Sequence, residues 1–404
     1  MSGISTLRVA GFISRRTITR GNRGVVVLTT TMMAAVFAEL LFIPSLILGA
    51  TEHIEQQLRD NITADITITP GGDAQTIPDA AGLLAQARAT PGVAAATSTA
   101  LAGSQVSAGS RSGSWSVLAV DPASYVQTFA TAREMIEGTF LAPGDTNEIV
   151  LGVGVAGAGR TDKATYTTSL QSVHAGDQVT VTLLGGESHP FTVKGVYDAQ
   201  LVEANQRAFI TATAAETLLP QLTGQASSVF VKTEHPGRED AVVAQLQKSR
   251  PDVVYKPWQT LESTVKDLTG SFDTIRSILN AVSLLVAAIA VFIITYIDLV
   301  NRRRTIGIER AIGISGVAIA LSYVLKAIVF AVVGVVLGAV LFRFAAVPFV
   351  DRHPFQFPIG PVTLSVTGAE MRRGAAVLIG VAALGALAPA WRSVRLHIVD
   401  AIWG

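Results

Sequence analysis

Four long apolar segments divide the chain into stretches of different character. We place them at 25–50, 275–300, 317–342 and 374–390. A helix needs roughly 20 apolar residues, with a range of about 17–25, to cross the hydrocarbon of a bilayer. Each segment therefore predicts a membrane span. The first is too long for the apolar region of a signal peptide and follows a polar, basic leader (1–24), so we expect an uncleaved anchor.

The long stretch between the first two spans has the pattern of an α+β domain. A strand, a helix and a strand are predicted near its start, and the same order returns near its end: 64–70, 79–90 and the segment from Val93, then 227–234, 238–249 and 252–258. Two such units at opposite ends of one domain predict a ferredoxin-like sheet with helices on one face. The spans and this domain together predict an α-helical membrane protein with an extracytoplasmic α+β domain.

Short strands dominate the middle of this stretch. They are SWSVLAV, NEIVLGV, DQVTVTLL, HPFTVKGVY and RAFI, separated by Gly-rich breaks such as Gly185-Gly186. We interpret them as a β-rich module at 115–210, inserted between a first half at 51–114 and a second half with its stalk at 211–274.

Both spans that flank this domain are expected to continue as helices into it. The segment TEHIEQQLRDNI extends the first span and has apolar Ile54 and Leu58 four residues apart. The chain from Gln259 to Ser277 is helical in pattern and reaches the second span without a breaker. Continuous helices would join the outer domain mechanically to the membrane.

Composition agrees with a membrane protein. Of 404 residues, 49% are hydrophobic and 15% charged, whereas soluble domains carry about 25% charged residues. The net charge of +1 gives no indication of nucleic-acid binding, and the absence of cysteine excludes disulfides and Cys-ligated metals.

The distribution of arginine predicts the orientation of the spans. The leader, the loop at 301–316 and the tail at 391–404 together carry 11 arginines, against four in the loop at 343–373. Because positive residues favour the cytoplasmic side, both termini are expected in the cytoplasm of a multi-pass inner-membrane protein. Arg372 and Arg373, at the outer end of the fourth span, run against this bias.

The sequence offers no catalytic motif. No G-x-x-x-x-G-K-[ST] phosphate loop is present, and the Gly-rich run at 151–160 lacks the order of a dinucleotide-binding turn. The six histidines show no metal-ligand spacing. We therefore expect no enzyme activity, no metal and no cofactor bound by this chain.

Two ionisable residues lie within predicted spans. Counted from the cytoplasmic ends at about 1.5 Å per residue, Glu39 lies near 22 Å and Lys326 near 14 Å. Charges at membrane depth usually face protein or water, so the two residues pair or both line a cavity between subunits. Alternatively, the first span projects from the bilayer and Glu39 reaches the headgroups. Gly334 and Gly338 have the G-x-x-x-G spacing of closely packed helices.

The loop at 301–316 reads NRRRTIGIERAIGIS up to Ser315. At helical spacing Ile306, Glu309 and Arg310 adjoin, as do Ile308 and Ile312. This pattern predicts a short amphipathic helix along the membrane surface. The alternative is a plain topology anchor, because arginines beside spans need no partner.

These motifs resemble the FtsX/MacB/LolC-LolE family of ABC-transporter permeases, the mechanotransmission type. The loop is similar to the family pattern R-R-R-E-I-G-I-L-R-A-L-G-A-S, and the tail from Pro389 to Ile402 is similar to P-A-x-R-A-A-R-L-D-P-V-E-A-L-R. A third likeness is the run from Gly176 to Val196, and the four-span plan also matches. The chain departs from the pattern at Thr305, where Glu is usual, and at Glu309, where an apolar residue is usual.

The resemblance implies a dimeric permease, with a second copy or a paralogue, seated on a cytoplasmic ABC ATPase dimer that binds the ATP. The loop would be the coupling helix, and the outer domain would contain a porter module with an inserted Sabre-like module. The ATPase-coupling interface implied by the motif is formed by Arg303, Arg304, Ile306, Gly307, Glu309, Arg310 and Gly313.

Two functions fit this resemblance. The first is export or extraction of a hydrophobic or lipidated substrate such as a lipoprotein, lipid, peptide or drug-like molecule. A periplasmic membrane-fusion protein or lipoprotein and membrane lipid would then be further partners. The second is a non-transporting transmitter that regulates an outer partner such as a cell-wall hydrolase. The size of the outer domain favours transport.

Overall fold

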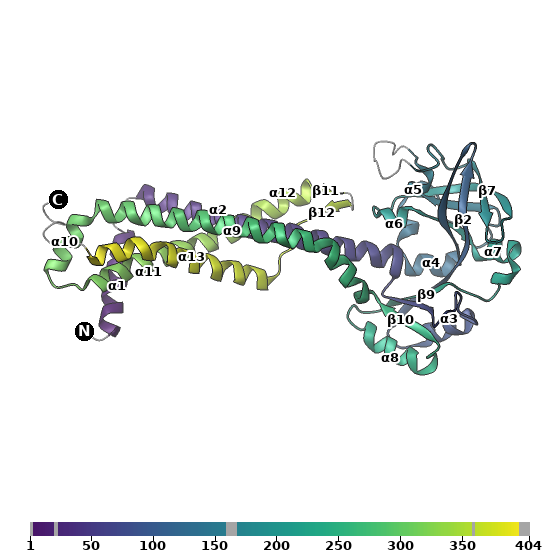
Figure 1. Ribbon diagram of the computed structural model, residues 1–404, viewed down its shortest axis with the longest axis horizontal. Helices are drawn as coiled ribbons and strands as arrows, with labels where there is room; N and C mark the ends of the chain where they lie inside the picture. Colours follow the sequence, from purple (N-terminus) through teal and green to yellow (C-terminus); the bar gives the residue numbers. More distant parts are fainter. Residues whose placement is uncertain (1–2, 20–22, 159–167, 358–359, 396–404) are drawn as a thin grey trace. The chain divides into compact units, whose positions relative to one another are not determined.

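The computed structural model describes residues 3–19, 23–158, 168–357 and 360–395. The chain divides into two compact units, which we describe separately. Unit one contains 1–51, 269–355 and 361–404, and unit two contains 52–268 and 356–360. The helices α2 and α9 each contain residues of both units (Figure 1).

Unit one is built from long helices. Its elements are α1 (Gly3–Thr19), α2 (Arg23–Leu58), α9 (Glu262–Asn301), α10 (Arg303–Ala311), α11 (Gly316–Leu341), a π-helical turn (Phe342–Ala346), α12 (Val347–Arg352) and α13 (Gly368–Arg395). The short strands β11 (Phe355–Phe357) and β12 (Gly360–Val362) contain residues of both units. Within the described residues, four helical stretches are long and apolar enough to cross a membrane. They correspond to the four spans that the sequence predicts. The leader, expected only to be polar and basic, forms the helix α1.

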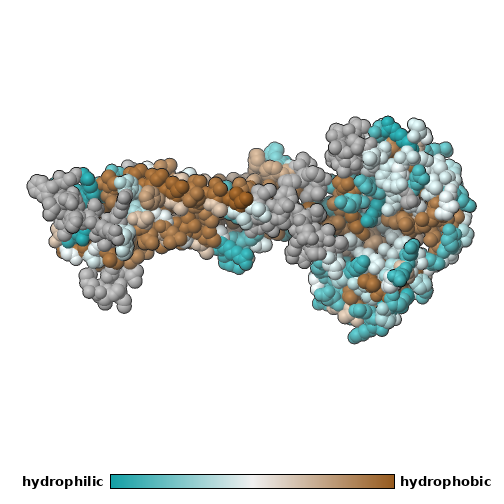
Figure 2. All heavy atoms as spheres, viewed as in Figure 1, coloured by the Kyte–Doolittle hydropathy of each residue, from teal (hydrophilic) through white to brown (hydrophobic). Residues whose placement is uncertain are grey.

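The spans pack through small residues and a continuous apolar core. Met33 and Phe37 of α2 are fully buried against α11 and α13. A Cβ atom on Gly338 would lie 2.6 Å from the carbonyl oxygen of Ala34, and one on Gly334 would collide with Met33. The predicted G-x-x-x-G contact is therefore confirmed, between α11 and α2. The outer faces of the helices are hydrophobic over much of their length (Figure 2).

Unit two contains a ferredoxin-like module. Its elements are β1 (Ile66–Pro70), α3 (Ala80–Ala89), β2 (Val93–Ala108), β9 (Ser228–Thr233), α8 (Glu239–Ser249) and β10 (Val253–Pro257). The strands pair antiparallel in the order β10-β1-β9-β2. Both helices pack on one face of this sheet around buried Ile66, Leu83 and Leu246. The predicted sheet and its helices are confirmed.

The second module is a closed barrel. Its strands are the far half of β2 together with β3 (Arg111–Val120), β5 (Glu148–Gly152), β6 (Gln178–Leu183), β7 (Ser188–Tyr197) and β8 (Arg207–Thr211). Pairing runs β2-β3-β8-β5-β7-β6 and returns from β6 to β2. Closure removes the edges of the sheet, and Val181, Phe191 and Ile210 fill the interior. The five strands named in the sequence all form.

Strand β2 belongs to both modules. Its register shifts on either side of Gly103, at a β-bulge. A Cβ on Gly103 would lie 2.8 Å from the carbonyl oxygen of Thr182, so glycine permits β6 to approach where the strand bends. The barrel thus uses residues ahead of 115, and that sequence-based boundary falls inside β3.

Smaller elements complete unit two. They are a π-helical turn (Arg59–Thr63), α4 (Pro122–Thr128), β4 (Met135–Gly138), α5 (Val153–Ala156), α6 (Val202–Asn205), α7 (Ala212–Leu218), and 3₁₀ turns at Thr131–Arg133, Pro220–Leu222 and Trp258–Leu261. Helix α4 brings Tyr125 and Phe129 into an aromatic cluster with Phe209 of β8 and Phe230 of β9, with ring centroids 5.1 Å apart for Tyr125–Phe209 and Phe129–Phe230.

Candidate functional site

The predicted amphipathic helix forms as α10, with a defined end. Gly313 adopts φ +98°, a conformation that glycine reaches without strain. Its N–H donates to the carbonyl of Arg310 at 3.0 Å, and the N–H of Ile314 donates to the carbonyl of Glu309 at 3.1 Å. These are the two hydrogen bonds of a Schellman motif. Ser315 then caps α11 by accepting from the N–H of Ala318. Gly313 is therefore first of all a helix terminator.

One face of α10 is packed into the chain. Ile306 is 3% exposed and lies in a buried cluster with Leu299 of α9, and with Ile319 and Tyr323 of α11. Gly307 is also buried. The family resemblance implies that both residues contact an ATPase. In this conformation neither is accessible, and Ile306 instead anchors α10 to the spans on either side.

The opposite face of α10 is basic and apolar. Arg303 and Arg304 are exposed, and Ile308 and Ile312 are 48% and 77% exposed. Because residues four apart share a helix face, Arg304, Ile308 and Ile312 form one exposed stripe. Arg303 is not on this stripe but is exposed as the first residue of the helix. We call these four residues the α10 surface. The two isoleucines were not named as interface residues, although their exposure follows from the burial of Ile306 on the other face.

Glu309, which stands where the family pattern has an apolar residue, faces inward. It is half-buried and lines a small cavity with Thr305, Arg302 and Lys326. Burial raises the pKa of Glu309, while Arg302 and Arg16 act in the opposite direction. Thr305 and Glu309 line the same cavity one turn apart. Moving the acid from 305 to 309 therefore keeps it on the same face of α10.

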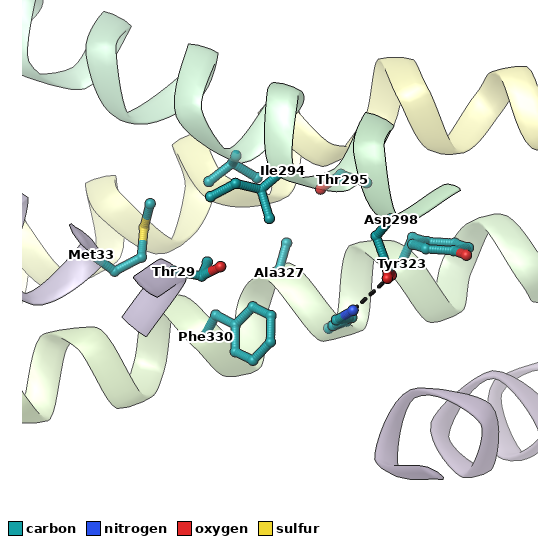
Figure 3. A pocket seen from close by; sticks show the side chains of 10 residues that line it. Thr29, Met33, Ile294, Thr295, Asp298, Tyr323, Ala327 and Phe330 are labelled. Carbon is teal, nitrogen blue, oxygen red and sulfur yellow. Dashed lines mark hydrogen bonds and ion pairs between the residues drawn. The ribbon is translucent and has the colours of Figure 1, made fainter. Parts of the chain in front are cut away.

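Next to this cavity, Asp298 of α9 holds two cations. It accepts from Nζ of Lys326 at 2.7 Å and from Nε of Arg302 at 3.1 Å. Lys326 is 9% exposed, and its Nζ lies 5.6 Å from the ring centroid of Phe330. Figure 3 shows Asp298 projecting from α9 toward α11, with the ion pair dashed. We call these three charged residues the Asp298 triad.

The triad corrects one prediction. Glu39 and Lys326 do not pair, because Lys326 reaches the nearer carboxylate of Asp298. Glu39 instead accepts a hydrogen bond from the hydroxyl of Ser283 on α9 and borders a shallow apolar groove with Phe42 and other residues. Asp298 was missed, although an acidic residue inside the second span, four positions before Arg302, is a recognisable signal.

A second charged cluster lies in unit two, where α2 ends. Asp65 is 4% exposed and accepts from Nε and Nη2 of Arg59 at 2.9 and 2.6 Å. Its other oxygen accepts from the N–H and the hydroxyl of Thr233. The Arg59 guanidinium also lies 5.0 Å from the ring centroid of Trp258. These contacts fix the end of α2 to β9 and to the segment that precedes α9.

Other predictions stay untested. Within the described residues, no group of three His, Cys, Asp or Glu side chains is placed to hold a metal. The tail motif from Pro389 to Ile402 lies only partly within the described residues, because those end at Arg395.

Comparison with known proteins identifies the family. The chain matches the MacB-like periplasmic core domain over residues 26–249, more than half of its length, and the FtsX-like permease C-terminal domain over residues 277–398. It is 27% identical over 195 residues to the "Macrolide export ATP-binding/permease protein MacB" of Neisseria gonorrhoeae, and 26% identical to that of Neisseria meningitidis serogroup A. Each alignment covers 46% of this chain and 29% of the relative, so this chain spans less than a third of those proteins.

Two solved structures with detectable similarity are of outer domains. The extracellular domain of the noncanonic ABC-type transporter YknZ from Gram-positive bacteria is 13% identical, with a TM-score of 0.34, covering 48% of this chain and 97% of that one. The periplasmic region of MacB from Actinobacillus actinomycetemcomitans is 14% identical, with a TM-score of 0.36, covering 52% and 95%. On the strength of the two family matches, the chain belongs to the FtsX/MacB-like family of ABC-transporter permeases.

Proposed function

We propose that this permease subunit couples ATP hydrolysis by a separate cytoplasmic ATPase dimer to movement of its extracytoplasmic unit two. In this proposal a second permease copy or paralogue completes the complex. The cargo is a hydrophobic or lipidated molecule that is exported or extracted. Both termini and α10 lie in the cytoplasm, as the arginine distribution predicts.

The α10 surface is the observation that carries this proposal. It presents two arginines and two exposed isoleucines from a helix whose other face is anchored by Ile306. An isolated topology anchor needs only the arginines. Exposed Ile308 and Ile312 beside them instead suit a protein interface, in which apolar anchors are surrounded by polar groups.

The direct test replaces these apolar anchors with charge. We expect Ile308→Glu/Ile312→Glu to abolish co-purification of an ABC ATPase, identified by mass spectrometry, from the native host. The thermal midpoint of the permease should stay unchanged, because both side chains are exposed. Val254→Glu is the matched control, since Val254 is a 42% exposed apolar residue on β10, and it should retain the ATPase.

Ile306→Glu is not a clean test of the interface, because it places a carboxylate in a buried cluster. We expect it to lower the thermal midpoint as well as ATPase binding. If the Ile308→Glu/Ile312→Glu variant binds the ATPase as well as the unchanged protein does, α10 is not the coupling helix.

A reconstituted complex separates the two candidate activities. Lipophilic cargo that stimulates the ATPase and leaves the membrane supports transport. An ATPase that ignores cargo but whose turnover activates an outer hydrolase supports the transmitter function.

A further inference from the structure

Arg373 stands in a groove that neither the fold nor the coupling function requires. The groove has a volume of about 210 Å³, many times the roughly 10–15 Å³ that holds one water molecule. Its walls come from α2, α9, α13 and the segment before α13: Leu40, Leu41, Pro44, Ser45, Asn280, Leu284, Val366, Glu370, Arg373, Gly374 and Val377. Apolar side chains form most of these walls, and a few polar groups lie among them.

The polar groups lie at similar distances from the α10 ends of their helices. At 1.5 Å per residue, Ser45 is about 33 Å from Arg23 along α2, Asn280 about 32 Å from Asn301 along α9, and Arg373 about 27 Å from Trp391 along α13. The hydrocarbon core is about 30 Å thick. Three helices thus place these groups at the same boundary between hydrocarbon and headgroups, at the ends of the spans opposite α10.

The hydrogen-bond donors in the groove lack acceptors. Ser45 is fully buried and its hydroxyl has no partner among the described residues. Two other hydroxyls of the same helix behave differently, since Thr29 and Thr51 each donate to the carbonyl four residues earlier. Within the described part of the chain, the side chains of Asn280 and Arg373 also have no hydrogen-bond or ion-pair partner.

The groove also contains acceptors. One carboxylate oxygen of Glu370 accepts from the N–H and the hydroxyl of Thr367 in a capping box. The other oxygen has no hydrogen-bond donor among the residues that the structure describes. Pro44 has no N–H, so the carbonyl of Leu40 loses its helical donor. Arg373 and Glu370 therefore place a cation and an anion in the lining of the same, mostly apolar groove.

We propose that this groove binds a phospholipid whose headgroup carries both a phosphate and an ammonium group. The guanidinium of Arg373 suits the phosphate, since arginine forms paired hydrogen bonds to its oxygens. The carboxylate of Glu370 suits the ammonium, and the acyl chains lie along the apolar walls. Assignment to the outer leaflet rests on the topology in the proposed function.

The neighbouring Arg372 is an example of an arginine that could contact lipid headgroups without a binding site. It is also exposed, but it does not line the groove. An arginine at a span end can simply extend its charge toward the headgroups. In Figure 2 a hydrophilic patch interrupts the hydrophobic helices near the start of α13. Arg372 and Arg373 differ in whether a shaped cavity lies beneath the charge.

Native mass spectrometry of the delipidated full chain tests the site. Phosphatidylethanolamine is the probe, with phosphatidylglycerol, which lacks the ammonium, as the comparison lipid. We expect Arg373→Gln to weaken phosphatidylethanolamine binding about tenfold, about 1.4 kcal/mol, and Arg372→Gln to change it less than twofold. Glu370→Gln preserves the capping box and should abolish the preference for phosphatidylethanolamine over phosphatidylglycerol.

Three outcomes overturn the site. Equal losses for Arg372→Gln and Arg373→Gln mean general attraction to headgroups. No preference between the lipids in the unchanged protein removes the role of Glu370. Equal binding of soluble glycerophosphoethanolamine means a site for the free headgroup rather than a lipid. ATPase co-purification from the same preparations separates the two proposals, because loss of lipid binding with the ATPase retained refutes only this one.

Discussion

Removing the carboxylate of Asp298 should destabilise the membrane unit more than removing either cation. At an effective dielectric of about 20, charges 2.7 and 3.1 Å apart attract by about 6 and about 5 kcal/mol. Loss of solvation offsets part of this, and breaking one partner from a buried pair typically costs about 3–5 kcal/mol. Asp298→Asn leaves Lys326 buried and unpaired, so we expect a loss in that range.

Removing the lysine should lower the free energy of unfolding by less than half as much as removing the carboxylate. Lys326→Met removes one cation but leaves Asp298 paired with Arg302, whose side chain is 31% exposed. Combining Asp298→Asn with Lys326→Met removes the stranded charge. The double variant should therefore be more stable than Asp298→Asn alone.

Thermal unfolding of the purified chain in one detergent, followed by intrinsic fluorescence, measures these differences. From the highest thermal midpoint to the lowest, the expected order is the unchanged protein, Lys326→Met, the double variant and Asp298→Asn. If the double variant unfolds at or below the midpoint of Asp298→Asn, the stranded lysine is not the source of the loss. Equal losses for the two single variants would show that Arg302 does not share the carboxylate.

Two further predictions concern the other carboxylates. Asp65→Asn weakens charged hydrogen bonds from Arg59 and Thr233 and should lower the free energy of unfolding by about 1.5–3 kcal/mol. Amide hydrogen exchange measures this: relative to the unchanged protein, the rate should rise more at Thr233 than at Val196 of β7. Burial raises the pKa of Glu309 above its ordinary value of 4.5. The contribution of protonated Glu309 to the free energy of unfolding is therefore fully present below pH 4.5 and is lost as the pH rises through the raised pKa. Glu309→Gln should therefore match the thermal midpoint of the unchanged protein at low pH and exceed it at neutral pH; a constant difference at all pH values would contradict this assignment.

Elements whose pattern depends on their own sequence were predictable. The spans follow from length and hydropathy, and the strand-helix-strand repeat at both ends of unit two follows from alternation. The stop at Gly313 and the start at Ser315 are also local, because a left-handed glycine and a capping hydroxyl act within a few residues.

Contacts between distant segments were not predictable in the same way. The sequence places Glu39 and Lys326 in spans, but which carboxylate reaches the lysine depends on the rotation of α9 and α11. Closure of the barrel depends on β2 bending at Gly103 to meet β6, which is some 80 residues later. The exposed face of α10 depends on which isoleucine the spans bury, and Ile306 and Ile308 have equal apolar character.

The Asp298 triad gives the α10 surface a mechanical connection to α9. Arg302 precedes α10, and its backbone N–H and its side chain both donate to Asp298. One turn after Arg302, the buried side chain of Ile306 packs in the same cluster as Leu299 of α9. In the proposed coupling function, a force on Ile308 or Ile312 would act on these contacts between α10 and the last turn of α9. Because α9 is one helix from Glu262 to Asn301, the turn that contacts α10 and residues 262–268 of unit two belong to the same helix. Lys326 extends the same contacts to α11, so the triad joins α9 and α11 next to the start of α10.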